Sequence, residues 1–261
     1  MTAIEFQLYE ISEVYAGWLY FPLDRAGEVL HAWREWTQTA PEEATSVAKL
    51  VQFPPFEEIP EVIRGKSFAA IEVAFLGSEA EGIELLKPLR ELGPQMDTFD
   101  MVGPEAIPYL HLDPPEPVPG HTGGHHMLNE LTAETVDELV EMMVPAIGDP
   151  LLMFEIRHLG GALARGGESH GALDRIEGDY MTFGCGIVMG PGAVEAIEAS
   201  LAPVAGVLAP HSAGRQYFNF VEGPSDASGF YGEETFRRLQ SVRAKYDALR
   251  LFQANHEIAP A

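Results

Sequence analysis

The stretch LLMFEIRHLGG, residues 151–161, constrains the fold more than any other part of the sequence. In an extended chain Glu155 and Arg157 point to one face of a sheet, and Ile156 between them points to the other. Gly160 and Gly161 follow at once and end the run, as glycines do at turns. We therefore predict a β-strand over residues 151–159 that carries Glu155 and Arg157 on one face.

Four other stretches are short, apolar or alternating, and bounded by Gly or Pro, which is typical of strands. They comprise residues 45–53, 67–76, 125–128 and 180–189. Residues 24–38, 79–92, 133–144 and 193–208 instead repeat apolar side chains at helical spacing, and Thr132 is placed to cap the third of these helices. Because strands and helices mix without strict alternation, we predict an α+β fold with a largely antiparallel sheet flanked by helices.

The first residues also alternate. Ile4, Phe6 and Leu8 are apolar, and Glu5 and Gln7 between them are polar. This pattern predicts a strand that begins almost at the first residue, as in a chain entered midway.

Residues 104–124 are rich in proline and glycine, so we predict that this segment is mostly irregular. A loop of this length inside a domain is often functional, and it could border a substrate entrance. The alternative is a surface excursion without a role, and the sequence leaves both open.

The chain is strongly acidic, with 40 Asp and Glu residues against 16 Lys and Arg residues and a formal net charge of -24. Such a charge repels phosphate backbones and anionic lipid surfaces, so we expect neither nucleic acid nor a membrane as partner. Cys185 is the single cysteine, which rules out an internal disulfide and a multi-thiolate zinc site. With no signal-peptide pattern at the N-terminus, we expect a soluble, cytoplasmic protein.

The segments after residue 160 follow one another in an informative order. Gly160-Gly161-Ala162-Leu163-Ala164-Arg165 comes after a strand, and Gln216-Tyr217-Phe218-Asn219-Phe220 comes after a helix and a turn. Tyr231-Gly232, Ala244-Lys245-Tyr246-Asp247 and Leu251-Phe252-Gln253-Ala254-Asn255-His256-Glu257-Ile258 complete the series. In this order and spacing they resemble the C-terminal region of FAD-linked oxidases of the berberine-bridge-enzyme-like type, within the vanillyl-alcohol-oxidase class.

The resemblance implies two parts, a substrate-binding-like domain over residues 1–209 and a berberine-bridge-enzyme-like C-terminal segment over residues 210–261. In the family, an N-terminal domain with a Gly-rich loop holds the FAD pyrophosphate, and no such cradle occurs in this sequence. The resemblance therefore implies that FAD is the cofactor and that a separate flavin-binding domain or chain supplies its main site. A homodimer is the other partner to consider.

The resemblance also suggests roles for three residues. Tyr217 would remove a hydroxyl proton from the substrate while hydride passes to flavin N5. Asn219, two residues further along a strand, would contact the flavin with its amide, and Asn255 would help to close the flavin site. A core role for Tyr217 and a surface role for Asn255 remain open. The sequence departs from the family where Tyr246-Asp247 continues with Ala248 in place of Pro.

On the substrate side, His126, Glu155 and Arg157 are the candidate pocket residues because they lie on predicted strands. Glu155 and Arg157 could equally form a salt-bridged solvent face. The strand over residues 180–189 contains no acid, so a carboxylate base is not expected there.

A metal site is the alternative for a group of chelating residues close in sequence: His111, Asp113, His121, His125 and His126. The spacing of His121 and His125 suits a helix, but Gly123 and Gly124 intervene, so we predict no metal.

Two classes of function follow from the sequence. In the first, the chain is part of an FAD-dependent oxidoreductase that acts on the CH–OH group of an alcohol-type substrate with oxygen as acceptor. In the second, it is a non-redox binding or assembly module, or a gene fragment without FAD binding of its own.

Overall fold

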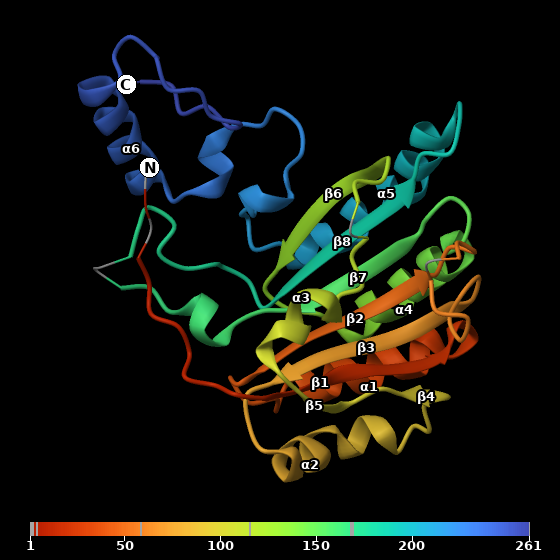
Figure 1. Ribbon diagram of the computed structural model, residues 1–261. Coiled ribbons are helices and arrows are strands. Elements are labelled where there is room, and N and C mark those ends of the chain that lie inside the picture. The colour runs from red at the N-terminus through yellow and green to blue at the C-terminus, as the bar shows by residue number, and fades with distance from the viewer. Residues whose placement is uncertain (1–2, 4, 58, 115, 168–169, 261) are drawn as a thin grey trace.

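The computed structural model describes residues 3, 5–57, 59–114, 116–167 and 170–260. Eight strands form one antiparallel sheet in the order β4-β1-β3-β2-β7-β8-β6, and β5 also pairs with β1 (Figure 1). The strands are β1 (Val14–Pro22), β2 (Ala44–Gln52), β3 (Ser67–Phe75), β4 (Met96–Asp97), β5 (Asp100–Val102), β6 (Gly120–Leu128), β7 (Met153–His158) and β8 (Tyr180–Ile187).

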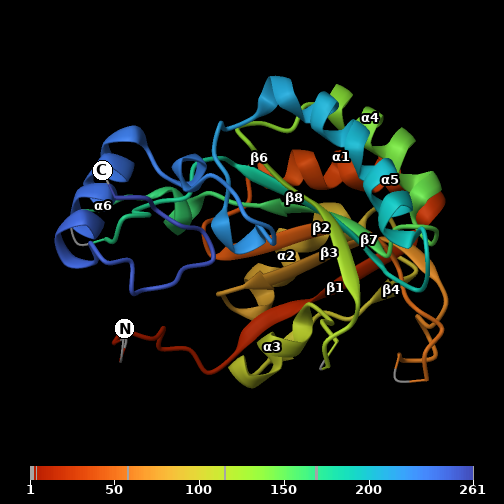
Figure 2. The same cartoon turned by 90° about the horizontal axis from the view of Figure 1, so that it is seen from above.

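Helices cover the two faces of this sheet unequally. They are α1 (Ala26–Thr37), α2 (Glu79–Arg90), α3 (Ile107–Leu110), α4 (Ala133–Met143), α5 (Ala193–Leu208) and α6 (Glu233–Tyr246). Helices α1, α4 and α5 lie together on one face, whereas the short α3 lies on the other (Figure 2). The predicted α+β fold with an antiparallel sheet flanked by helices is confirmed.

The helix side of the sheet holds the main core. In α4, for example, the Thr132 hydroxyl accepts a hydrogen bond from the backbone N–H of Thr135, which caps the helix as predicted. Val136, Leu139 and Met143 recur at helical spacing and are fully buried. They pack in the same cluster as buried side chains of α1, α5 and the sheet. This face is therefore held by apolar contact.

A second, smaller core lies on the opposite face at the β1 and β3 end of the sheet. It contains seven buried residues: Trp18, Tyr20, Val51, Phe53, Ile63, Phe68 and Ala70. The Trp18 and Tyr20 rings stack with centroids 5.4 Å apart. Leu110 of α3 packs against this cluster, so the loop after β5 covers part of the face. The remainder carries the polar residues described below.

The turn after β7 explains the glycine pair in the sequence. Gly160 has a φ of 101° and Gly161 a φ of 50°, which is the left-handed region that side chains disfavour. The chain can thus leave the strand and enter the 3-10 helix Gly161–Ala164 directly. An Xaa-Xaa pair with Cβ atoms would strain this turn.

Two local predictions were wrong. Residues 5–9 form no strand and the first strand begins at Val14, while residues 1, 2 and 4 lie outside the described part. Alternation alone is insufficient here because the segment has no neighbouring strand with which to exchange hydrogen bonds among the described residues. Residues 104–124 are also less irregular than predicted, since they contain α3 and the first half of β6.

The stretch 193–211, which includes α5, is the single helical segment in the described ranges that is long and apolar enough to cross a membrane. Four of its side chains are buried against the rest of the fold: Ile197, Leu201, Val204 and Leu208. Core helices commonly have this character, and the apolar stripe of α5 is used in that way.

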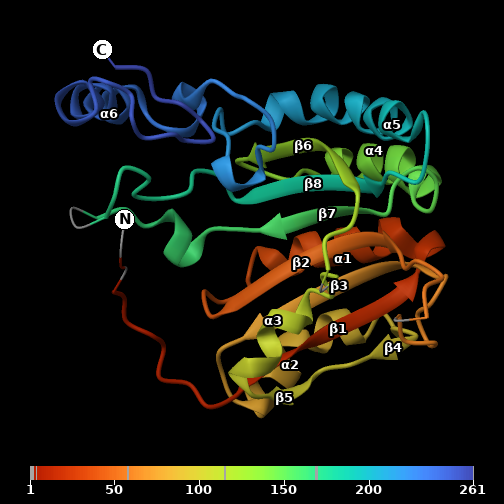
Figure 3. The same cartoon turned by 45° about the horizontal axis from the view of Figure 1, so that its top comes forward.

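The C-terminal segment adds no named strand to the sheet in the described part of the chain, although its first residues contact β6 and β8. Its described part forms short 3-10 helices at Phe218–Phe220 and Ala227–Phe230 and then α6. The N-terminal stretch and α6 lie at the same end of the molecule (Figure 3). A division into residues 1–209 and 210–261 stays a prediction.

Leu139→Ala is expected to lower the free energy of unfolding by about 3 kcal/mol, because it removes buried apolar contact and leaves a cavity. Urea denaturation measures the change. Glu138→Ala, at an exposed position of the same helix, is the matched control and should change stability by less than about 0.5 kcal/mol. Equal losses in the two variants would contradict the described packing of α4.

Candidate functional site

Strand register gathers charged side chains on the sheet face opposite α1, α4 and α5. Residues directly opposite each other on paired strands point to the same face. Lys49 on β2 pairs with Glu155 on β7, which pairs with Phe183 on β8. In the next row, Glu72 on β3 pairs with Val47 on β2, and Val47 pairs with Arg157. Both rows face away from the main core.

Five ionisable residues form one cluster on this face, and we call it the polar cluster: Lys49, Glu72, His111, Glu155 and Arg157. Arg157 Nε donates to Glu155 Oε1 at 2.6 Å, and Arg157 Nη2 lies 3.1 Å from His111 Nε2. Lys49 Nζ lies 3.3 Å from Glu72 Oε2 and 3.6 Å from Glu155 Oε2. Lys49 and Arg157 therefore each contact at least one carboxylate.

His111 joins the polar cluster from the loop after α3. Its Nδ1 lies 2.9 Å from Glu72 Oε2, and its Nε2 lies 3.4 Å from Glu155 Oε2. The adjacent Leu110 holds the loop in place, because its carbonyl accepts a 2.7 Å hydrogen bond from Trp18 Nε1. The sequence alone does not decide whether the segment 104–124 borders a substrate entrance or is a surface loop without a role. In the structure, this segment brings the His111 imidazole to the sheet.

The two glutamates set the protonation of the polar cluster. Burial lowers the pKa of His111, but its contacts with Glu155 and Glu72 outweigh burial and raise that pKa to about 9. Burial raises the pKa of Glu155, but His111, Lys49 and Arg157 outweigh it and lower that pKa to about 2. At neutral pH the site thus holds an imidazolium and a carboxylate.

The sequence pointed to Glu155 and Arg157 and missed the other three members. Lys49 and Glu72 are each the single charged residue of an otherwise uncharged strand. This isolation is the sequence feature that could have identified them. An isolated charge on a buried strand needs a partner on the same face. In the sequence, His111 stands out only as a possible metal ligand. In the described part of the chain, no group of three or more His, Cys, Asp and Glu side chains is arranged to hold a metal ion.

The structure does not bring His126 together with Glu155 and Arg157. His126 pairs with Thr182, and Thr182 pairs with Ile156 of the main core, so His126 lies on the helix side of the sheet. His125 pairs with Phe183 and shares the face of Glu155 instead. His126 nevertheless lines an open groove of about 860 Å³ together with His125 and Phe220, so a substrate role for it stays a prediction.

Tyr217 lies beside this face but not on a strand. Its backbone N–H donates to His125 Nε2 at 2.7 Å, and the segment then closes into the 3-10 helix Phe218–Phe220. Burial lowers the pKa of His125, which keeps its imidazole neutral and able to accept this bond. The expected Tyr-x-Asn strand was wrong, because local hydrogen bonds and His125 satisfy the backbone that a strand partner would use.

Phe220 links Tyr217 to the polar cluster. Its ring centroid is 5.5 Å from that of Tyr217, and the Arg157 guanidinium carbon lies 5.0 Å from the same ring. Phe183 completes the contact, with its centroid 5.5 Å from that of Phe220. The predicted catalytic tyrosine and the predicted substrate residue Arg157 are therefore separated by one aromatic ring.

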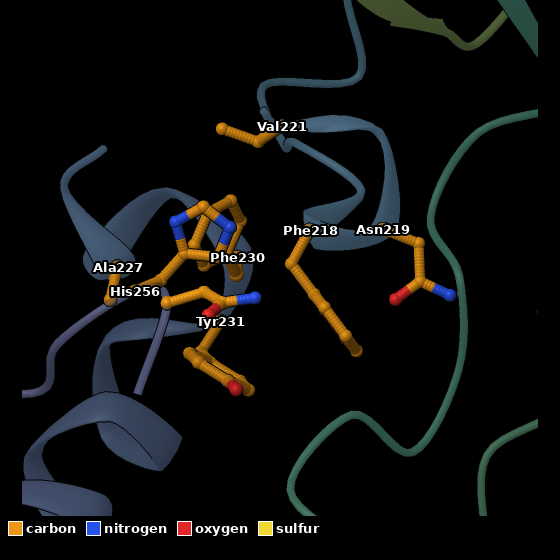
Figure 4. Close-up of a pocket in the computed structure, with 8 residues that line it drawn as sticks. Phe218, Asn219, Val221, Ala227, Phe230, Tyr231 and His256 are labelled. Carbon is orange, nitrogen blue, oxygen red and sulfur yellow. The ribbon is translucent and has the colours of Figure 1, made fainter. Parts of the chain in front are cut away.

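Asn219 and Asn255 line a different hollow, an open pocket of about 610 Å³ in the C-terminal segment. Figure 4 shows the rings of Phe218, Tyr231 and His256 around it, with the Asn219 amide at its edge. Tyr217 borders a neighbouring pocket of about 230 Å³. The structure thus brings the two asparagines together and places Tyr217 outside their pocket.

The lining of this 610 Å³ pocket can be tested against the chemistry of FAD. Amide and imidazole groups among aromatic rings suit a flat heteroaromatic ring with carbonyl and N–H groups on its edge. Among the described residues that line the pocket, none is Lys or Arg. The pocket therefore fits the ring end of a flavin and offers no cation for the diphosphate.

Comparison with known proteins places this architecture in a class. The fold is that of part of a berberine-bridge-enzyme-like oxidase. BBE-like 1 from Physcomitrella patens superposes with a TM-score of 0.75 at 13% identity, covering 96% of this chain and 55% of that one. A chitooligosaccharide oxidase superposes with a TM-score of 0.70 at 16% identity, covering 96% of this chain and 56% of that one.

One relative is also similar in sequence. The chain is 26% identical over 258 residues to the uncharacterized FAD-linked oxidoreductase YvdP from Bacillus subtilis (strain 168), which covers 93% of this chain and 53% of the relative. No protein-family model matches the chain. The chain spans about half the length of the curated relative that it matches.

His111 is expected to stabilise the fold at neutral pH and to lose this effect in alkali. A histidine whose folded pKa is raised to about 9 contributes stability below its unfolded pKa of about 6.5, and the contribution disappears as pH rises through about 9. The contribution amounts to about 3 kcal/mol at most. Urea denaturation at neutral and alkaline pH measures it.

His111→Asn should flatten this alkaline loss, whereas His170→Asn, at an exposed position outside the polar cluster, should leave it unchanged. An NMR titration of the wild-type imidazoles provides a direct check. A His111 midpoint at or below the ordinary value for histidine would refute the described charge arrangement.

Proposed function

We propose that this chain is the substrate-side part of an FAD-linked oxidoreductase, and that it acts on the CH–OH group of an alcohol-type substrate with oxygen as acceptor. The observation that carries the proposal is the alignment with an FAD-linked oxidoreductase, which is 26% identical and covers 93% of this chain. The fold shared with berberine-bridge-enzyme-like oxidases supports it. The position of Tyr217 beside the polar sheet face supplies a base where a substrate could lie.

In this proposal Tyr217 acts as a phenolate, removes the hydroxyl proton of the substrate and becomes a neutral phenol. FAD, when bound, accepts a hydride at N5. His125 holds the Tyr217 backbone through its 2.7 Å hydrogen bond, and Phe220 packs between Tyr217 and Arg157. These contacts fix the position of the phenol relative to the sheet, which is what a proton transfer requires.

Asn219 and Asn255 would contact the edge of the flavin ring from their shared pocket. Among the described residues that line this pocket there is no Lys or Arg to bind the diphosphate, so we propose that a flavin-binding domain or chain supplies that part of the site. Large apolar side chains exposed near both ends of the chain are available to cover: Phe6, Leu8, Tyr9, Tyr246, Leu249, Leu251 and Phe252. Exposed apolar surface of this kind favours association with a partner. A second copy of this chain, forming a homodimer, is the alternative to a flavin-binding partner.

A non-redox binding or assembly module is the second candidate. The observation that favours it is that no Lys or Arg occurs among the described residues lining the 610 Å³ pocket. Such a module would keep the sheet and its polar cluster and would bind a ligand without electron transfer. Flavin binding separates the two candidates.

The purified chain alone is expected to retain little flavin absorbance after FAD is added and the excess is removed, and to retain it when the flavin-binding partner is present, because the described lining of the 610 Å³ pocket has no Lys or Arg for the diphosphate. The double variant Asn219→Ala and Asn255→Ala should retain less flavin, because it lacks two amides that can each donate and accept hydrogen bonds. Asn129→Ala, outside this pocket, is the control. A colourless protein with and without the partner would favour the non-redox module.

In the assembled oxidoreductase, Tyr217→Phe is expected to reduce turnover about a hundredfold or more, because general base catalysis contributes at least that much. Steady-state kinetics with oxygen consumption measure the change. Tyr109→Phe, at an exposed tyrosine of α3, should leave turnover within a factor of about two. Full activity in Tyr217→Phe would remove Tyr217 from the mechanism.

A further inference from the structure

We propose that Arg157 and His111 form an anion-binding site on the open face of the sheet, and that this site selects a substrate bearing a carboxylate. The inference deepens the proposed function by naming a substrate class, and it rests on that function only for the oxidation. Binding at the site requires no flavin, so it can be tested on the chain alone.

The order of exposure within the polar cluster directs its positive groups outward. The side chains of Glu155 and Lys49 are 0% and 2% exposed, and that of Glu72 is 10% exposed. His111 and Arg157 are the outermost members, at 21% and 29%. A ligand that approaches this face therefore meets an imidazole and a guanidinium before it meets a carboxylate.

The charges of the polar cluster do not cancel when His111 is protonated. Lys49 and Arg157 balance Glu72 and Glu155, and the imidazolium then adds one positive charge. An excess charge that is largely removed from water is costly unless a counter-ion is nearby. A ligand carboxylate at the outer side would complete the balance.

Arg157 also has donor capacity left for a ligand. Its Nε donates to Glu155 and its Nη2 lies against His111, whereas Nη1 makes no hydrogen bond to a described residue. The guanidinium lies over the Phe220 ring, with its central carbon 5.0 Å from the centroid. A planar guanidinium in this setting suits a carboxylate, which it can bind through charge-assisted hydrogen bonds.

The neighbouring pocket offers space for the rest of such a substrate. Phe220, which contacts Arg157, also lines an open groove of about 860 Å³ together with His125 and Met127. Tyr217 contacts the same Phe220 ring. A carboxylate on Arg157 would therefore place the body of the ligand against Phe220, whose ring also borders this groove.

The effect of pH on this site depends on the groups that face His111. They are Glu72 on β3, Lys49 on β2, and Glu155 and Arg157 on β7. Burial is the main cause that raises the pKa of the Cys185 thiol, and the carboxylates of Glu155, Glu222 and Asp113 add to it. Loss of the His111 proton would leave Arg157 as the remaining outer cation.

The test uses the purified chain and a matched pair of probes, sodium benzoate and benzyl alcohol. Isothermal titration calorimetry or ¹⁵N NMR should show that benzoate binds at least about tenfold more tightly than the alcohol. Arg157→Gln should abolish the preference, and Arg157→Lys should restore part of it. Arg165→Gln, which removes an exposed arginine elsewhere, should have no effect.

Raising the pH above the range in which His111 is protonated should weaken benzoate binding several-fold in the wild type and leave His111→Asn unchanged. Equal binding of benzoate and benzyl alcohol would overturn the inference, as would a preference that survives Arg157→Gln in a variant with a native NMR spectrum. Benzoate selectivity without FAD retention, even in the presence of the flavin-binding partner, would uphold the anion site and count against the oxidoreductase. Oxidase activity without benzoate selectivity would support the oxidoreductase and overturn the anion site.

Discussion

The Glu155 carboxylate is the group on which the second face of the sheet depends. It is 0% exposed, and an unpaired carboxylate in that position would cost several kcal/mol. Arg157 two residues along the same strand and Lys49 directly across the ladder both approach it. A slip of one residue between β2 and β7 would turn Lys49 to the other face and leave Glu155 without this partner. Electrostatics and strand register therefore support one another.

This arrangement gives the two faces of the sheet separate roles. The helix-covered face is apolar and holds the fold together, with Ile156 of β7 in its core. Glu155 and Arg157, on either side of Ile156, face the loop of His111 and the ring of Phe220. Because side chains alternate along a strand, one short segment contributes to both faces. Changes to the polar cluster can thus alter binding without opening the main core.

The sequence predicts the parts of the fold that depend on local pattern. The helix capped by Thr132 and the strand that carries Glu155 were both recognised from periodicity, because each buries one stripe or face. The strand that the resemblance implies for Tyr217 and Asn219 is absent because strand formation needs a partner, and here His125, 92 residues away, accepts the hydrogen bond from the Tyr217 N–H instead. The sequence predicts only two members of the polar cluster, Glu155 and Arg157, because the cluster also depends on contacts between residues far apart in the chain. His111 is 62 residues from Lys49 in the chain, and no local pattern reports that contact.

The overall acidity of the chain makes the positive outer edge of the polar cluster more selective. With a net charge of -24, the surface as a whole disfavours anions at long range. This long-range field is screened within about 10 Å in ordinary buffer, whereas contact between an anion and a half-buried guanidinium is screened far less. An anion that reaches Arg157 is therefore held by short-range geometry rather than by general attraction. A partner that covers this face would exclude water and strengthen the same contacts, so assembly and substrate selection would reinforce each other.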